Sequence, residues 1–304
     1  MKNGNESRPI SGYLLIIGAA VLWGTTGTSQ ALAPAGVTPL SIGAMRLLLG
    51  SLALLALALS QGGFRRRTGW DIRAVLIAGS AIAAYQVTFF AGVKLASIAI
   101  GTIVGIGSAP IFGALLGHFY EHEKLERRWF LATALSLSGV VLLGAAGKQS
   151  LDLDPRGVLL ALAAGLTYAV YTLYNKRLLA THDPDEVMAA TFGLGALLLL
   201  PFIFTSPMQW LASPRGMLVA GHLGLIATGL SYALFGRGLK SVPVSTTTTL
   251  TLAEPLTAGL LGVLVVGERL PPVALIGIAL IAAGLLMLTV FRPAGQTRDT
   301  APGG

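Results

Sequence analysis

The stretch SAPIFGALLGHFYEHEKL, residues 108–125, has a counterpart 145 positions later in AEPLTAGLLGVLVVGERL, residues 253–270. Each stretch has a proline in the middle of an apolar run, Pro110 or Pro255, and each ends on Glu, a basic residue and Leu. The same offset relates three further pairs: Gly12 and Gly157, Trp23 and Tyr168, and Gly139 and Gly284. Because one offset without gaps relates all of these positions, the sequence predicts a single structural unit used twice.

The composition is that of a membrane protein. Of the 304 residues, 54% are hydrophobic and 11% are charged, and the mean hydropathy is +0.74, whereas a soluble domain has roughly 25% charged residues. The net charge of +8 comes from basic residues in short loops between apolar runs. That pattern indicates membrane orientation and argues against a nucleic-acid partner. The lack of cysteine excludes disulfides, thiolate catalysis and Cys-ligated metals.

Apolar runs long enough to cross a bilayer, about 20 residues, recur along the chain. They predict an all-α membrane protein with ten transmembrane helices, at about 11–31, 38–60, 70–93, 97–119, 127–146, 156–179, 185–205, 214–238, 243–266 and 271–291. The tails, 1–10 and 292–304, are polar. A signal peptide ending at Ala31-Leu32-Ala33 is the alternative for the first run, but the run is long for one, and we expect it to be retained.

The basic residues are distributed unequally between the two sides that ten helices define. The tails and loops on the side of the termini carry fifteen Lys and Arg residues, and the opposite loops carry five. The positive-inside rule therefore predicts a multi-pass protein of the inner or plasma membrane, with both termini in the cytoplasm.

The predicted repeat contains five helices, an odd number, so its two copies, 11–146 and 156–291, must lie in opposite orientations. The loop charges agree, because Arg65-Arg66-Arg67 follow the second helix while the matching loop has only Arg215. Inverted repeats are the architecture of many secondary transporters, in which a site between the halves faces each side of the membrane in turn.

Short motifs in both halves resemble the drug/metabolite transporter superfamily, EamA type. They are Leu22-Trp23-Gly24, Arg46-Leu47-Leu48, Gly92 through Ala99, Ser108-Ala109-Pro110, Glu123-Lys124-Leu125, Ala253-Glu254-Pro255, and Gly267-Glu268-Arg269-Leu270. The resemblance covers about residues 11–291. It implies ten helices in two EamA repeats, alternating access by helix bending around the prolines, and export of amino acids or other metabolites. In the aromatic amino-acid type a His follows the Tyr of the third helix, where this chain has Gln86 after Tyr85.

Two charged residues are expected deep in the membrane, where a charge costs on the order of 2.5–3.5 kcal/mol and should face protein or water. Arg46 either clamps a substrate carboxylate or is structural, bonded to helix-end carbonyls. Glu254 either carries a proton, which would couple transport to protons, or is a fixed partner of Arg46 or of a neighbouring helix.

Pro110 and Pro255 fall in the middle of their predicted helices. Each removes a backbone donor and frees the carbonyl four residues earlier, at Ile106 or Thr251. Their matched positions predict hinges for an alternating-access motion, with static kinks as the alternative.

A central cavity is expected between the first, third, fourth, sixth, eighth and ninth helices, with the fifth and tenth at the periphery. Its predicted lining residues are Trp23, Thr26, Tyr85, Gln86, Tyr168, Tyr171, Ser231 and Thr249. Aromatic and hydroxyl groups together suit a small ligand with an apolar part and a polar group. The alternatives are plain packing and an interfacial aromatic belt.

The stretch His118–His122 matches the zinc-protease pattern H-x-x-E-H. It straddles a predicted helix end, and the second repeat lacks it, so we expect no metal and no other cofactor. His222 is expected to be a neutral buried histidine. With no Walker A sequence, ATP is excluded as the direct drive.

We therefore expect a secondary transporter in the lipid bilayer that exports small metabolites, with amino acids, aromatic ones included, as the leading class. A passive channel or facilitator and a drug or amine exporter are alternatives, and an intramembrane enzyme is a remote one.

Overall fold

The computed structural model describes residues 9–64, 69–96, 98–145, 154–267 and 270–290. Within these ranges the regular elements are all helical. They are α1 (Pro9–Ala31), α2 (Pro39–Ser60), α3 (Ile72–Ala96), α4 (Ile98–Glu121), α5 (Arg127–Ala145), α6 (Pro155–Leu178), α7 (Pro184–Thr205), η1 (Gln209–Ala212), α8 (Pro214–Gly221), η2 (His222–Leu230), α9 (Ser231–Leu239), α10 (Val244–Leu250), α11 (Ala253–Leu261), η3 (Gly262–Val266) and α12 (Pro272–Thr289).

These elements form ten spans, as predicted. In the described part of the chain, nine helices are long and apolar enough to cross a membrane. They include two composite spans, the eighth from α8, η2 and α9 and the ninth from α10, α11 and η3. The tenth is α1, which has 23 residues and packs along α9 and α11. Large apolar side chains such as Phe204 (81% exposed) and Leu264 (79% exposed) cover the outer surface, as expected where lipid is the solvent.

Several spans begin at a capping residue followed by proline. The hydroxyl of Thr38 accepts from the backbone N–H of Ser41, and the Ser41 hydroxyl lies 3.1 Å from the Thr38 nitrogen, which forms a capping box for α2. Asp154 caps α6 by accepting from the backbone N–H of Arg156, and Ser213 caps α8 by accepting from that of Gly216. These bonds satisfy N–H groups that lipid could not, so the helix starts are readable from the sequence.

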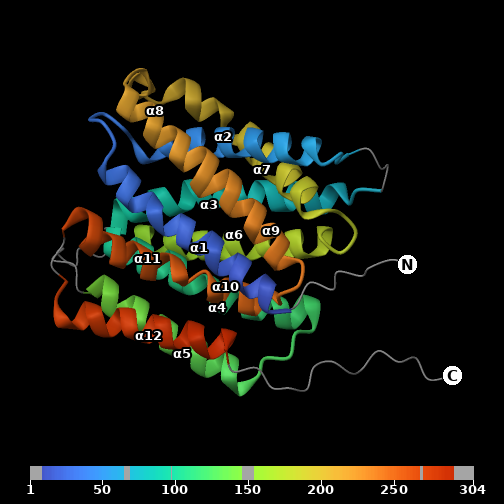
Figure 1. The fold of residues 1–304 in the computed structure, drawn as a ribbon, viewed down its shortest axis with the longest axis vertical. Helices are drawn as coiled ribbons and strands as arrows, with labels where there is room; N and C mark the ends of the chain where they lie inside the picture. The colour runs from blue at the N-terminus through green and yellow to red at the C-terminus, as the bar shows by residue number, and fades with distance from the viewer. Residues whose placement is uncertain (1–8, 65–68, 97, 146–153, 268–269, 291–304) are drawn as a thin grey trace.

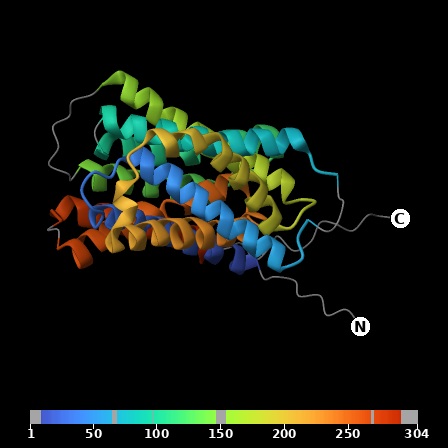
Figure 2. The same ribbon diagram turned by 90° about the horizontal axis from the view of Figure 1, so that it is seen from above.

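The helices run along a common direction, with their connections gathered at two ends (Figures 1 and 2). We call the end at which α1 begins the N-side and the opposite end the far side. The packing follows the repeat, because corresponding spans of the two halves lie against each other: α2 against α7, α4 against α10, and α5 against α12. The remaining spans pair crosswise, since α3 packs on α6 and the eighth span packs on α1. Helices α5 and α12 form one edge of the bundle (Figure 1), so the fifth and tenth spans are peripheral.

Close glycine contacts repeat with the offset of 145 residues. A β-carbon on Gly139 of α5 would lie 2.5 Å from the carbonyl oxygen of Gly277 in α12. A β-carbon on Gly284 of α12 would lie 2.5 Å from the carbonyl oxygen of Ala132 in α5. Gly139 corresponds to Gly284, and Ala132 corresponds to Gly277, so the two contacts are copies of one another.

A second pair of contacts shows the inversion. Gly12, near the start of α1, packs against Ser241 just beyond α9 on the N-side. Its counterpart Gly157, near the start of α6, packs against Ala96 at the end of α3 on the far side. Since Ala96 and Ser241 are also 145 residues apart, the two halves make the same contact at opposite ends of the bundle.

The motif of Glu, a basic residue and Leu ends both stretches that the repeat offset relates. In the second half its first two residues, Glu268 and Arg269, lie outside the described residues.

The two matched prolines have different effects on their helices. Pro110 lies inside α4, which continues without interruption. The ninth span is broken at Thr251 and Leu252, between α10 and α11. Because Pro255 has no N–H to give to Thr251, that carbonyl accepts instead from Glu254 at 2.9 Å. The Thr251 hydroxyl in turn donates to the Thr248 carbonyl at 2.8 Å.

The eighth span contains a π-helical segment, η2, that single-sequence reasoning did not predict. It runs from His222 to Leu230, and the hydroxyl of Thr228 donates to the carbonyl of Leu223, five residues earlier. Such wide turns are rare and occur frequently at functional sites. This segment packs along α2.

Candidate substrate pocket

A pocket lies between the two repeats in the far-side half of the bundle. Seven residues predicted to line a cavity or carry charge meet here: Trp23, Thr26, Arg46, Tyr85, Gln86, Tyr168 and Glu254. The lining also includes residues outside the predicted cavity set: Gln30, Phe89, Phe90, Gly105, Ile106, Ala109, Tyr232 and Thr251. All of them lie on the first, second, third, fourth, sixth, eighth and ninth spans.

Three predicted cavity residues lie away from this pocket. Tyr171 is fully buried in the core, with its hydroxyl 3.3 Å from the sulfur of Met188. Thr249 faces α5, where its hydroxyl is 3.1 Å from that of Thr133. Ser231 is buried behind Trp23 and accepts a hydrogen bond of 2.8 Å from the indole N–H. Ser231 therefore orients a lining residue without lining the pocket itself.

An aromatic cluster forms the N-side floor of the pocket. Trp23 and Tyr168, which the repeat offset pairs, meet edge to face with ring centroids 6.4 Å apart. Trp23 also lies 4.8 Å from Tyr232 and 5.5 Å from Phe235. Tyr232 continues the cluster to Phe192 at 4.2 Å. Aromatic rings in such contact pack densely, so this floor separates the pocket from the N-side.

The pocket holds one cation and one carboxylate that do not pair. Arg46 is 9% exposed, and its Nε has no hydrogen-bond partner among the described residues. Glu254 lies in the first turn of α11 and lines the same pocket. No ion pair within 4.0 Å joins the two side chains, and no hydrogen bond to the described chain occupies either one.

Two further polar atoms of the lining also lack partners within the described chain. They are the hydroxyl oxygens of Thr26 on α1 and Tyr168 on α6. Most buried polar side-chain atoms in proteins have a hydrogen-bond partner, and exceptions require an explanation such as a functional role. Together with Arg46 Nε, three such atoms from both repeats converge on one pocket.

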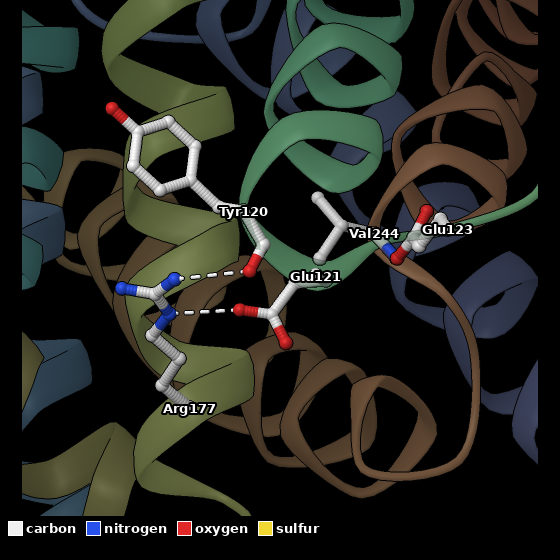
Figure 3. A network of polar contacts seen from close by, with 5 residues as sticks. All are labelled: Tyr120, Glu121, Glu123, Arg177 and Val244. Atoms are coloured by element: carbon white, nitrogen blue, oxygen red, sulfur yellow. Dashed lines mark hydrogen bonds and ion pairs between the residues drawn. The ribbon is translucent and has the colours of Figure 1, made fainter.

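The N-side of the bundle is tied together by polar contacts around the end of α4. The Glu123 carboxylate accepts from the backbone N–H groups of Val244 (2.5 Å) and Ser245 (3.0 Å) and from the Ser245 hydroxyl (2.6 Å). It therefore caps α10 from the loop that follows α4. Beside it, Arg177 of α6 pairs with Glu121 at 2.7 Å and donates to the Tyr120 carbonyl (Figure 3).

Further contacts on the N-side link the remaining spans. Lys176 of α6 donates to three carbonyls at the end of α9, those of Leu239, Lys240 and Val242. Arg237 of α9 pairs with Asp185 of α7 at 2.7 Å. Asp185 also accepts from Gln61, which follows α2. These contacts join α2 to α7, α7 to the eighth span, the eighth span to α6, α6 to α4, and the end of α4 to the ninth span. The packing of Gly12 joins α1 to the end of the eighth span.

The far side has fewer polar contacts between spans among the described residues. His222 Nε2 lies 2.8 Å from the hydroxyl of Thr25. Because this hydroxyl donates to the Leu22 carbonyl at 2.6 Å, the imidazole nitrogen is the donor in the pair. Arg215 donates to the carbonyl of Leu32. The pocket lies on this side, with Gln30 near the end of α1 and Phe90 in the last two turns of α3.

The residues of the zinc-like motif shape the end of α4. Glu121 is engaged with Arg177, and His118 Nδ1 lies 3.1 Å from the Glu123 carbonyl. His122 adopts φ 53°, a left-handed conformation that ends the helix. The Glu123 N–H then donates back to the Gly117 carbonyl at 3.0 Å. The motif therefore makes the turn that directs Glu123 toward α10.

Several known proteins are similar to this chain in sequence over most of its length. An uncharacterized transporter of Bacillus subtilis, YwfM, is 42% identical over 95% of this chain and 97% of its own length. The threonine/homoserine exporter RhtA of Escherichia coli K12 is 28% identical over 94% of each chain. A probable terminal-alkyne amino-acid exporter of Streptantibioticus cattleyicolor is 27% identical over 88% of this chain and 89% of its own.

A solved crystal structure, at 24% identity, matches with a TM-score of 0.80 over 92% of this chain and 96% of that chain, which shows the fold. The model of the EamA-like transporter family matches twice, over residues 10–145 and 155–290. The chain therefore belongs to the EamA-like transporter family.

Proposed function

We propose that the protein is a secondary transporter that exports small metabolites, with amino acids as the leading class, by alternating access through the pocket between its repeats. The observation that carries this proposal is the pocket itself. Both repeats line it, it contains unpartnered polar atoms, and an aromatic floor and a network of polar contacts close its N-side. Two relatives named as exporters of amino acids support this substrate class.

We place the N-side in the cytoplasm, on the positive-inside argument. On this proposal the structure is read as an outward-facing state, because the pocket lies in the far-side half and the aromatic floor and polar contacts lie on the cytoplasmic side. In the opposite state, the contacts of Glu123 and Lys176 would break and the far-side ends of the spans would close. Pro110 and the break at Thr251 before Pro255 are the proposed bending points.

Glu254 is the proposed carrier of a coupled proton. It is the acidic residue of the pocket lining, and no Asp, Lys or His among the described residues lines the pocket. A carboxyl group in a partly desolvated site can bind and release a proton as the site changes its exposure. Coupling of this kind would allow export against a gradient without ATP.

Reconstitution tests the transport function. Purified protein in liposomes should accumulate a radiolabelled amino acid faster than empty liposomes, and preloading with unlabelled substrate should accelerate uptake. Such trans-stimulation is expected of a carrier, whereas a channel would lack it. No flux above empty liposomes for any amino acid, amine or drug in a broad screen would contradict the proposal.

Two tryptophan substitutions on α4 provide a matched control. Ile106 lines the pocket, whereas Ile111 is 51% exposed on the outer surface of the same helix. Ile106→Trp should stop flux by filling the pocket, and Ile111→Trp should transport like the unmodified protein. Equal flux from both variants would place the transport route elsewhere.

A further inference from the structure

We propose that the pocket selects zwitterions, with Arg46 binding the carboxylate and Glu254 the ammonium group of an α-amino acid. This inference rests on the proposed transport function and specifies how the substrate is recognised. It begins from the unusual state of Arg46. An Arg side chain stays protonated in proteins, and a buried charge is costly unless it is paired or hydrogen-bonded. Within the described chain neither condition is met for its Nε.

Glu254 supplies the opposite charge at a separate position. It comes from the ninth span, in the second repeat, whereas Arg46 comes from the second span, in the first. Both line the pocket, but no ion pair within 4.0 Å connects them. A ligand can therefore contact both groups without first having to break a salt bridge between them.

The chemistry of these two groups defines the ligand. A guanidinium group binds a carboxylate through two parallel N–H donors, and a carboxylate binds an ammonium group through charge-assisted hydrogen bonds. An α-amino acid carries both partners one carbon apart. A simple amine would leave Arg46 without its anion, and a simple carboxylic acid would leave Glu254 facing another negative charge. The pocket should therefore discriminate against both.

The remaining lining residues fit the rest of such a ligand. The unpartnered hydroxyls of Thr26 and Tyr168 can each donate to a carboxylate oxygen or accept from an ammonium group. Tyr85 and Phe89 stack with ring centroids 5.6 Å apart, and with Phe90 they provide an apolar wall for a side chain. Since no other charged residue of the described chain lines the pocket, Arg46 and Glu254 alone determine its charge selectivity.

The test compares three ligands that share one side chain. They are L-phenylalanine, phenethylamine, which lacks the carboxylate, and 3-phenylpropionate, which lacks the ammonium group. A parallel set uses L-leucine, isopentylamine and 4-methylpentanoate, in case the wall prefers an aliphatic group. Binding to the purified full chain is measured by calorimetry, and flux is measured in liposomes. We expect one amino acid to bind at least tenfold more tightly than both of its singly charged analogues.

Two variants assign each charge to its residue. Arg46→Gln should weaken amino-acid binding at least tenfold and leave the affinity for the amine nearly unchanged. Glu254→Gln should weaken amino-acid binding to a similar extent and leave or raise the affinity for the carboxylic acid. A purely structural role of either residue would lower affinity for all three ligands together. If Arg46→Gln does not fold, Glu254→Gln and the ligand series with the unmodified chain still decide the matter.

The outcomes separate this inference from the proposed function. Flux of an amine or an acid that equals or exceeds flux of its amino acid would overturn zwitterion selection, while the protein would remain a transporter. The same applies if both variants keep the unmodified preference. Absence of flux for every compound tested would instead overturn the transport function, and this inference with it.

Discussion

Gly139 in α5 and Gly277 in α12 meet backbone to backbone, so that a β-carbon on either would lie 2.5 or 2.7 Å from the carbonyl oxygen of the other. The repeat-related contact of Gly284 with Ala132 is equally close. Without side chains between them, the two helix backbones can approach to contact distance. This close backbone contact holds α5 and α12 together at the edge of the bundle.

Gly139→Ala and Gly284→Ala should therefore each destabilise the protein by about 1–3 kcal/mol, because an added methyl group forces the backbones apart. Gly193→Ala in α7 is the control, since its added β-carbon would meet nothing within 4 Å. There we expect no loss, and a gain of up to roughly 1 kcal/mol from helix propensity. Thermal unfolding in detergent measures all three, and equal melting temperatures would refute the close contact.

Loss of the Glu123 cap should open the N-side. Glu123→Gln weakens three hydrogen bonds to α10, and bonds to a charged group contribute about 1.5–3 kcal/mol each. Because the chain has no cysteine, a single Thr247→Cys substitution in buried α10 reports opening by maleimide labelling. We expect labelling to rise at least tenfold in the Glu123→Gln background.

The exposed Asp183 is the matched control for this experiment, since its side chain makes no capping bond to α7. Asp183→Asn should leave the labelling rate of Cys at position 247 unchanged. If Glu123→Gln and Asp183→Asn label alike, Glu123 does not hold the N-side closed.

The ion pair between Arg177 and Glu121 should contribute much less. The two side chains are 38% and 29% exposed, and pairs in contact with solvent contribute about 0.2–1 kcal/mol. A double-mutant cycle with Arg177→Ala and Glu121→Ala should give a coupling energy in this range. A coupling above about 2 kcal/mol would show that the pair is as important as the Glu123 cap.

Pro255→Ala and Pro110→Ala should differ in their effects on flux. Pro255→Ala supplies an N–H for the Thr251 carbonyl and favours one continuous helix across the break, so flux should fall severalfold while folded yield is kept. Because α4 is continuous through Pro110 already, Pro110→Ala should change flux less. If flux and yield fall in parallel for Pro255→Ala, the break is a packing feature and not a hinge.

Glu254→Gln tests proton coupling directly. Gln cannot exchange a proton, so flux through this variant should lose its dependence on an imposed pH gradient while the protein stays folded. The measurement is uptake into liposomes with and without a gradient, at equal protein content. A pH dependence equal to that of the unmodified protein would remove Glu254 from the coupling role.

The positions of the helices could be predicted from the sequence, since a long apolar run between charged loops has few alternatives in a membrane. The repeat offset also indicated which positions are equivalent in the packing of the helices, since Gly139 and Gly284 make equivalent contacts. The freed carbonyl at Thr251 could be predicted from Pro255, but the sequence did not indicate that the ninth span breaks there while α4 continues through Pro110. The π-helical segment at His222 carried no sequence signal either.

The pocket lining was only partly predictable for a geometric reason. Successive side chains of a helix point about 100° apart. In a span that is apolar on every face, the sequence has no hydrophobic periodicity that would show which face points toward the pocket. Thus Ser231 lies behind Trp23 while its neighbour Tyr232 faces the pocket. Thr249 faces α5 while Thr251 lines the pocket. The rotation of each helix about its own axis, which decides which residues face the pocket, is set by tertiary packing and cannot be read from one sequence.

The unequal effects of Pro110 and Pro255 have a thermodynamic consequence. Two identical inverted halves would give inward- and outward-facing states of equal free energy. Because α4 is continuous and its counterpart is broken, the two states are no longer related by a two-fold rotation. Their populations then differ about tenfold for each 1.4 kcal/mol of difference in free energy between them. Under alternating access, the same substrate would then show different apparent affinities from the two faces of the membrane, and the resting protein would spend most of its time open to one of them.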